Sequence, residues 1–451
     1  MRIIYLLLFI VCACKNGSSR DIKHFSLEDN ESMIYENYTM QHNGVAKDEK
    51  NEVLVERNAG LAGNSYFLNQ KNDINCLYNC EQSILKIGVV AMSLTGQGTL
   101  EEIENTIAFL NSNIDGRQYS VFSLKKEDLT DLSILSPDII VGPFKDSDVQ
   151  ELEKTLQKQN LNTPIVSLTT TVNSSKPNIY YFGYSNNDIV QSTIQTGDKM
   201  GFENYGVLMP NNAIGSATYN LFKKHIDNAG KKISRVEFYD DSSIDTISKF
   251  ISKIEIAVKQ KYYISQDGTI IDDNYSFTKN IKTENEKSIT LNNGQRYEKK
   301  YKKMDALIID SDDKNFEVIF DALTQNKAFE DVVIVGSPRI IDSVIFAAKK
   351  EKYLQIEKPL MFSGNYEFYS NFYTSYLEQF GIRPTRLSTT LYETLVYLIA
   401  LHKKHDITQE FNPAKLPEFA GLNGDIFVNH KSAIRSGKMC EFKNGKVKEG
   451  E

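Results

Sequence analysis

The chain has 451 residues; 41% are hydrophobic, 25% are charged, and the formal net charge is −7. These proportions are usual for a water-soluble globular protein, and the length is enough for two lobes of ordinary size. The acidic balance argues against a general nucleic-acid-binding protein, which needs a basic surface.

Residues 1–14 have the pattern of an exported signal peptide. Arg2 gives a positive start, and Ile3 to Val11 form an apolar run too short to span a bilayer, which takes about 20 residues. The segment Val11-Cys12-Ala13-Cys14 resembles the bacterial lipobox, with Cys14 as the residue that carries the lipid. The alternative is an ordinary cleaved signal with incidental cysteines. Acyl chains on Cys14 would attach the mature protein to the membrane.

Residues 15–82 are polar and rich in Asn, Glu, Lys and Ser, without sustained periodicity. Such a composition predicts a flexible tether rather than a domain. Lys15, rather than Asp, directly after the anchor resembles the pattern of lipoproteins sorted to the outer membrane. We therefore expect a lipid-anchored protein of the bacterial cell envelope that faces the periplasm.

Three cysteines remain after the anchor: Cys76, Cys80 and Cys440. In an oxidising compartment Cys76 and Cys80 could close a small disulfide loop. Reduced, unpaired thiols are an equally good interpretation, because three cysteines cannot all pair within one chain. The spacing does not predict a zinc site, since a second cysteine pair and nearby histidines are missing.

From residue 83 onward, short apolar, β-branched runs alternate with segments of helical periodicity. Strands are expected at 84–92, 119–124, 139–141, 164–168, 180–184, 205–209, 236–239, 306–310, 332–335 and 359–362. Helices are expected at 100–110, 147–159, 188–200, 216–229, 244–259, 342–351, 371–380 and 388–402. A further helix is expected between the strand at 306–310 and about residue 325. This alternation predicts an α/β protein with parallel sheets.

Because the rhythm restarts after residue 184, we expect two Rossmann-like lobes within 83–447. Lobe 1 is predicted to contain about 83–184 and 359–425, and lobe 2 about 185–358 and 426–447. Residues 260–303 break the rhythm and are interpreted as a surface insertion with a small hairpin around Asn292-Asn293-Gly294. In the tail, 424–428 and 438–443 alternate and are expected to form one β-hairpin.

Several loop motifs, in this order, resemble the type I periplasmic binding protein superfamily of leucine-binding-protein-like domains, over roughly 85–447. They are I-G-V-V-A-M-S-L-T-G at 87–96, I-I-V-G-P-F-K-D-S-D-V at 139–149, T-P-I-V-S-L-T-T-T at 163–171 and Y-G-V-L-M-P-N-N-A-I-G at 205–215. Gly142-Pro143-Phe144 with Val149 to Leu152, and Phe182-Gly183-Tyr184-Ser185 with Asp188, are similar to the penicillin-binding protein activator branch. The resemblance implies two lobes with central parallel sheets, joined by hinge strands.

The resemblance also implies a ligand cleft between the lobes, lined by loops at the carboxyl ends of strands. Carried over by position, its residues are Ser93, Thr95, Lys145, Asp146, Thr169, Thr170, Thr171, Asn211, Asn212, Asp310, Ser311 and Ser337. Phe144, Lys145 and Asp146 stand where small hydroxyl residues would hold an amino acid's carboxylate, which argues against binding of free amino acids. A polar loop that caps a helix is the alternative for 169–171.

Signatures of catalysis are missing from the sequence. Gly96-Gln97-Gly98 is a partial dinucleotide motif, and His402 to His405 lack a ligand partner at metal spacing. No enzyme activity, cofactor or metal is therefore predicted. The favoured function is an envelope lipoprotein that regulates a peptidoglycan synthase. The alternative is the substrate-binding protein of an ABC transporter, with a permease as partner and an amino acid or other small polar solute as ligand.

Overall fold

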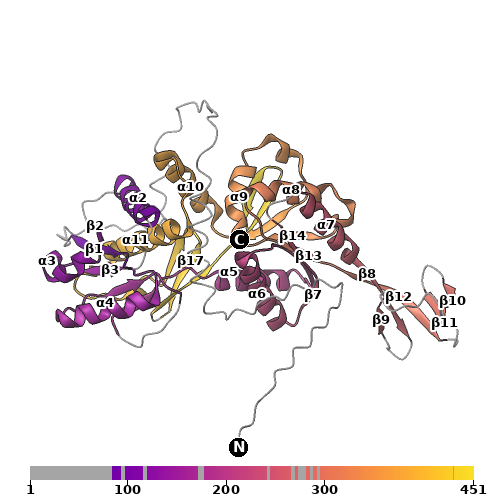
Figure 1. Ribbon diagram of the computed structural model, residues 1–451, viewed down its shortest axis with the longest axis horizontal. Helices are drawn as coiled ribbons and strands as arrows, with labels where there is room; N and C mark the ends of the chain where they lie inside the picture. The colour runs from indigo at the N-terminus through magenta and orange to yellow at the C-terminus, as the bar shows by residue number, and fades with distance from the viewer. Residues whose placement is uncertain are drawn as a thin grey trace, which may run out of the picture.

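Two α/β lobes lie side by side in the computed structural model, and a separate small sheet projects from the second lobe (Figure 1). The structure describes residues 84–92, 97–114, 119–170, 177–240, 244–265, 270–272, 281–284, 288–291, 295–429 and 431–450. The two-lobed α/β fold with mostly parallel sheets, expected from the sequence, is confirmed. Residues 1–83, which contain the predicted signal peptide and tether, lie outside the described residues.

Lobe 1 is built on an eight-stranded sheet in the order β16-β17-β18-β5-β4-β3-β1-β2. β1 to β5 run parallel, and because helices cover both faces of the sheet their sequences are nearly continuous apolar runs. The strands are β1 Leu85–Val90, β2 Tyr119–Leu124, β3 Ile139–Val141, β4 Ile165–Ser167, β5 Ile179–Tyr181, β16 Glu418–Gly421, β17 Gly424–Asn429 and β18 Ser432–Ser436. Its helices are α2 Gln97–Asn113, α3 Leu132–Leu135, α4 Asp146–Lys158 and α11 Arg386–Lys404.

Lobe 2 has a seven-stranded sheet in the order β20-β19-β15-β14-β13-β6-β7, parallel from β15 to β7. The strands are β6 Asn204–Pro210, β7 Lys232–Tyr239, β13 Ala306–Ile309, β14 Val333–Gly336, β15 Leu360–Ser363, β19 Met439–Lys443 and β20 Lys446–Glu449. The helices are α5 Asn186–Lys199, α6 Ala213–Asn228, α7 Ile244–Val258, α8 Asp313–Gln325 and α9 Ile340–Ala347.

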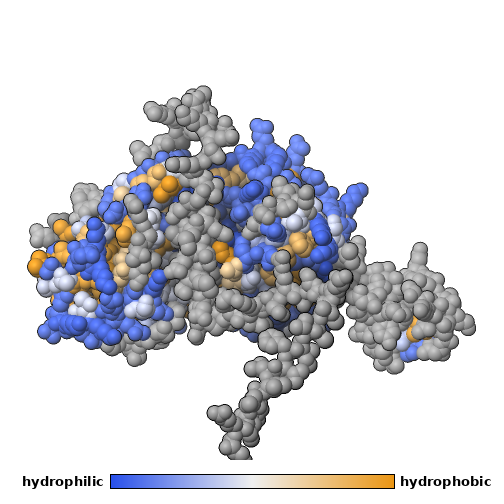
Figure 2. Space-filling model, viewed as in Figure 1, coloured by the Kyte–Doolittle hydropathy of each residue, from blue (hydrophilic) through white to orange (hydrophobic). Residues whose placement is uncertain are grey.

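Amphipathic helices cover the sheets, and α4 illustrates how. Val149, Leu152 and Leu156 repeat at helical spacing, are buried, and belong to a core cluster with strand residues of lobe 1. The opposite side of α4 carries Lys154 and Lys158. Figure 2 shows a hydrophilic band at the lower left, where α4 lies in Figure 1. The apolar stripe therefore fixes which side of α4 faces the sheet.

The expected insertion at 260–303 is a folded unit that projects from lobe 2. It forms a five-stranded antiparallel sheet in the order β10-β11-β12-β8-β9, at the far right in Figure 1. β11 and β12 pair antiparallel on either side of 292–294, so the expected hairpin there is confirmed. The strands are β8 Lys259–Ser265, β9 Ile270–Asp272, β10 Ile281–Glu284, β11 Ser288–Leu291 and β12 Arg296–Lys303.

The predicted hairpin of 424–428 with 438–443 is wrong. β17 pairs with β16 and β18 in lobe 1, whereas β19 pairs with β15 and β20 in lobe 2. Between β18 and β19 the chain crosses from one lobe to the other, and Gly437 passes so close to Gly364 that an added Cβ would lie 3.0 Å from its nitrogen. The expected boundaries shift accordingly: β15 belongs to lobe 2, and 426–436 belong to lobe 1.

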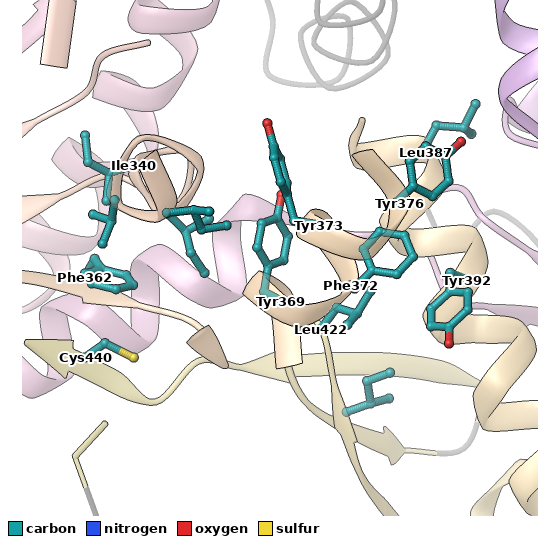
Figure 3. Packing of buried hydrophobic residues seen from close by; sticks show 14 of the residues in the cluster. Ile340, Phe362, Tyr369, Phe372, Tyr373, Tyr376, Leu387, Tyr392, Leu422 and Cys440 are labelled. Atoms are coloured by element: carbon teal, nitrogen blue, oxygen red, sulfur yellow. The ribbon is translucent and has the colours of Figure 1, made fainter. Parts of the chain in front are cut away.

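Helix α10 (Tyr366–Phe380) packs between the lobes with two aromatic faces (Figure 3). Phe372 lies 5.2 Å, ring centre to ring centre, from Phe109 of α2 in lobe 1. Tyr373, one position on, lies 5.8 Å from Phe346 of α9 in lobe 2. Successive residues on a helix point about 100° apart, so neighbouring aromatic residues reach opposite lobes. α10 starts five residues before the expected 371, and its last turn ends at Gly381, which has the left-handed conformation common after helices.

The first turn of α11 is capped by a carboxylate from another helix. Glu102 of α2 is buried, and its Oε1 accepts hydrogen bonds from the backbone N–H groups of Thr385 at 3.3 Å and Ser388 at 3.2 Å, and from both hydroxyls. Burial raises the pKa of Glu102 above its ordinary value, and the hydrogen bonds from Ser388 and Thr385 oppose this only in part.

Truncation of the α10 core tests how far this helix stabilises the protein. Phe372→Ala should lower the free energy of unfolding by about 3–5 kcal/mol, because a buried ring is lost and a cavity is left. Phe427→Ala is the matched control, since Phe427 is 39% exposed and its loss should change stability far less. Urea denaturation measures both; equal losses would contradict the assigned role of α10.

The Glu102 cap predicts a pH-dependent stability. A carboxyl whose pKa is raised by folding stabilises the native state while it is protonated, and this contribution is lost as pH rises through the folded-state pKa. As pH increases above about 4, the free energy of unfolding of the wild-type protein should therefore fall, whereas that of Glu102→Gln should not show this decrease. Denaturation of both proteins at a series of pH values checks this, and a pH-independent difference would contradict it.

Candidate functional site

The candidate site is the region between the lobes at the carboxyl ends of their parallel strands, where the sequence predicts the ligand cleft. Three segments cross between the lobes, after β5, after β15 and after β18. They lie together: Thr193 Oγ1 is 2.8 Å from Ser363 Oγ, and Ser192 donates to the Gly437 carbonyl at 3.1 Å. The crossings therefore form one hinge region beside the cleft.

On the lobe 2 side, the structure brings together two of the predicted residues and adds an arginine. Asp310 follows β13 and Ser337 follows its parallel neighbour β14, and Ser337 Oγ donates to Asp310 Oδ1. Arg339 donates to both carboxylate oxygens of Asp310, from Nε and Nη2, at 3.1 Å each. Asp310 is fully buried, so its charge is neutralised within the protein rather than by a ligand.

The other predicted residues of lobe 2, Asn211, Asn212 and Ser311, differ in burial and in hydrogen bonding. Asn212 is the N-cap of α6, and its Oδ1 accepts the Gly215 N–H at 2.9 Å, which is a structural role. Asn211 is exposed beside it. Ser311 is buried, and its Oγ has no hydrogen-bond partner among the described residues. A buried hydroxyl of this kind is open to a water or a polar ligand.

On the lobe 1 side, the predicted residues follow β3 and β4. Thr169 is buried, with its Oγ1 3.0 Å from Ser167 Oγ, and its carbonyl accepts the Gly183 N–H at 3.2 Å. Thr170 is half-buried next to it. Lys145 is the N-cap of α4 and Asp146 is its first residue; both are half-buried. Ser93, Thr95, Thr171 and the cysteines Cys14, Cys76 and Cys80 lie outside the described residues.

Arg386 joins the two lobes across the cleft. It stands in the first turn of α11 in lobe 1, and its Nη2 donates to the Pro338 carbonyl of lobe 2 at 3.0 Å. Its Nη1 donates to Asn423 Oδ1, and its guanidinium carbon is 4.3 Å from the centre of the Tyr184 ring. The planar guanidinium can hold all three contacts at once, which a lysine ammonium could not.

Two further links reach lobe 2 from α10 and the loop after it. Arg383 forms an ion pair with Asp313, the first residue of α8, and stacks over Phe346 at 4.5 Å. Tyr369 donates to Asp342 Oδ1 at 2.6 Å. Burial raises the pKa of Asp313, and the charge of Arg383 offsets that rise in part. Polar contacts thus accompany the aromatic packing of α10 on lobe 2.

Arg435 holds the hinge together from within lobe 1. It is 1% exposed, and it pairs with the fully buried Glu393 of α11, Nε to Oε1, at 2.7 Å. It also donates to the carbonyls of Phe182 at 2.9 Å and Gly183 at 2.8 Å, where the first crossing leaves the sheet. A buried ion pair with these added hydrogen bonds ties the first and third crossings to α11.

Sequence reasoning did not single out Arg339, Arg383, Arg386 or Arg435. A signal was present, because only ten of the 52 basic residues are arginines and four of these lie at the cleft and hinge. Among the described residues, no three His, Cys, Asp or Glu side chains converge as a metal site requires. None of the described helices has the length and apolarity needed to cross a bilayer.

Comparison with known proteins supports the fold. Residues 127–266 match the family model LppC, a putative lipoprotein family. Haemophilus influenzae LpoA is similar in structure, with 17% identity over 82% of this chain and 59% of that chain and a TM-score of 0.51. Its C-domain, described as that of a regulator of PBP1A, matches with 15% identity, 81% and 100% coverage and a TM-score of 0.49.

A leucine-binding protein, LivK from Thermotoga maritima, matches with 15% identity over 82% of this chain and 98% of that chain, at a TM-score of 0.40. No curated protein matches the chain. The chain spans about three fifths of the LpoA chain. Two lobes, central parallel sheets and three crossings give the chain the type I periplasmic-binding-protein fold.

The Arg435–Glu393 pair generates a stability prediction. Arg435→Met should lower the free energy of unfolding by about 3–5 kcal/mol, because it leaves the Glu393 charge buried and unpaired. Adding Glu393→Gln should restore part of that loss, since the unpaired charge is removed while an oxygen remains for the Asn423 N–H. Urea denaturation of wild type, single and double variants measures this; a double variant less stable than Arg435→Met would refute it.

Proposed function

We propose that the chain is a non-catalytic lipoprotein of the bacterial cell envelope that binds and regulates a peptidoglycan synthase. The match of 127–266 to a putative lipoprotein family supports the anchor at Cys14. The likeness in fold to LpoA, described as a regulator of PBP1A, supports this class of partner. The outer membrane, which Lys15 favours, is the proposed site of anchoring.

The observation that carries the proposal is that side chains bridge the two lobes beside the cleft. Arg386 donates to Pro338, Arg383 pairs with Asp313, and α10 packs against both lobes. A solute carrier closes on its ligand, so its two lobes need to separate and return. Here such a movement would break these two polar links and the hydrogen bond from Tyr369 to Asp342, and would separate the aromatic interface of α10. An arrangement of this kind suits a fixed surface for a protein partner.

A substrate-binding protein of an ABC transporter is the second candidate, supported by two buried polar atoms near the cleft. Ser311 Oγ and Asn423 Nδ2 have no hydrogen-bond partner among the described residues. Asn423 contacts Arg386, so its free amide group lies beside the link between the lobes. These two groups are where a small polar solute would find hydrogen bonds, with a permease as the partner.

Binding to a class A penicillin-binding protein tests the first candidate. The chain from residue 15 onward should bind the immobilised synthase of the same organism, and Arg386→Ala should weaken binding because the two lobes lose a link. Arg296→Ala is the matched control, since Arg296 is exposed on the projecting sheet. Absence of binding by wild type contradicts the proposal, and equal binding by both variants contradicts the role of the closed cleft.

Thermal unfolding with a panel of amino acids and short peptides separates the two candidates. At a concentration 100 times the dissociation constant, a ligand stabilises the native state by about 2.7 kcal/mol and raises the melting temperature by several degrees. We expect no such shift. A shift with one amino acid that disappears in Ser311→Ala would favour the transport function instead.

A further inference from the structure

A cavity lies in lobe 1 at the edge of the sheet away from the cleft. It has a volume of about 660 Å³ and is lined by residues at the amino ends of β3, β4 and β5, by α4, and by the segment after α11. The volume is in the range of sites that hold small ligands, ~300–1,000 Å³. None of the residues assigned to the cleft lines it, so it is a separate site.

Three side-chain amides at this cavity are free. Asn162, Asn178 and Gln409 line it from three different segments, and none of their side chains makes a hydrogen bond with the protein in the described ranges. An amide both donates and accepts hydrogen bonds, as a sugar hydroxyl does. A ligand that carries several hydroxyl groups can therefore satisfy all three.

An aromatic pair supplies an apolar surface at the same cavity. The rings of Tyr180 and Phe411 meet edge to face with centres 4.7 Å apart, and both side chains are half-buried. The Tyr180 hydroxyl donates to the Phe411 carbonyl at 3.4 Å, which fixes the pair. An aromatic ring beside free amides suits a sugar ring, which has an apolar C–H face and a polar rim.

The charges at the cavity favour a neutral ligand. Among the residues that line it, none is Lys, Arg or His, so phosphates and carboxylates find no cation. Asp138 and Glu153 line it too, but both already accept hydrogen bonds: Asp138 from the Lys86 N–H at 2.7 Å and Glu153 from Gln157 at 3.3 Å. Their charge is partly satisfied, which leaves the amides and rings to select the ligand.

We propose that this cavity is a binding site for a neutral saccharide. The cleft and the cavity lie at opposite edges of the lobe 1 sheet, so a protein partner at one leaves the other accessible. The site does not depend on the proposed synthase partner, and its test is independent of that one.

Calorimetric titration of the chain from residue 15 onward, which contains every described residue, tests the site. The probes are chitotriose and maltotriose, with cadaverine as a cation and trigalacturonate as an anion of similar size. We expect at least one neutral trisaccharide to bind with a dissociation constant below about 1 mM, and neither charged probe to do so. Absence of binding by both trisaccharides, or tighter binding of a charged probe, overturns the proposal.

Paired variants locate the binding. Gln409→Ala should weaken saccharide binding about fivefold and Phe411→Leu about five- to tenfold, through loss of a hydrogen bond and of a ring contact. Gln150→Ala, on the outer side of α4, and Phe427→Leu are the matched controls in the same lobe. Gln409 is exposed, so its variant should fold normally even if Phe411→Leu does not. Equal affinities of Gln409→Ala and Gln150→Ala overturn the assignment of the site.

Discussion

The arrangement of the whole molecule depends on one helix that packs aromatic side chains against both lobes. Phe372 and Tyr376 of α10 contact Phe109 of lobe 1, whereas Tyr373 contacts Phe346 of lobe 2. A gap of about 0.5–1 Å between packed atoms forfeits a quarter to a half of their dispersion energy, so these rings favour one relative position of the lobes. Every polar contact across the cleft, from Arg386 to Pro338 and from Arg383 to Asp313, requires that position.

Arginine side chains pair with the buried carboxylates at the cleft and the hinge. In a binding protein, polar groups at the carboxyl ends of the strands are available to a ligand. Here Arg339 neutralises Asp310, and Arg435 neutralises Glu393 at the hinge. A guanidinium satisfies a carboxylate and nearby carbonyls at the same time, so both carboxylates are already paired within the protein. These pairings agree with the proposed role as a fixed surface for a protein partner.

Lobe 1 also has different properties at its two edges. At its carboxyl edge Arg386 reaches across to the Pro338 carbonyl of lobe 2, whereas its amino edge opens into a cavity with free amides and two rings. In doubly wound sheets, ligands ordinarily bind at the carboxyl edge, where the loops diverge. The cavity lies at the opposite edge, so the proposed protein partner at the carboxyl edge leaves it accessible.

The sequence by itself determined the α/β class, the two lobes, most strands and helices, and the hairpin around 292–294, because these follow from local periodicity. The family resemblance, and not local periodicity, suggested Asp310 and Ser337 as cleft residues, and the structure brings these two together. Only the tertiary structure decided the strand partners of the tail: alternation identifies 424–428 and 438–443 as strands but does not say which strand each pairs with. The same holds for Arg386, Arg435 and the aromatic residues of α10, because a side chain's role depends on which distant residues lie within hydrogen-bonding or van der Waals range.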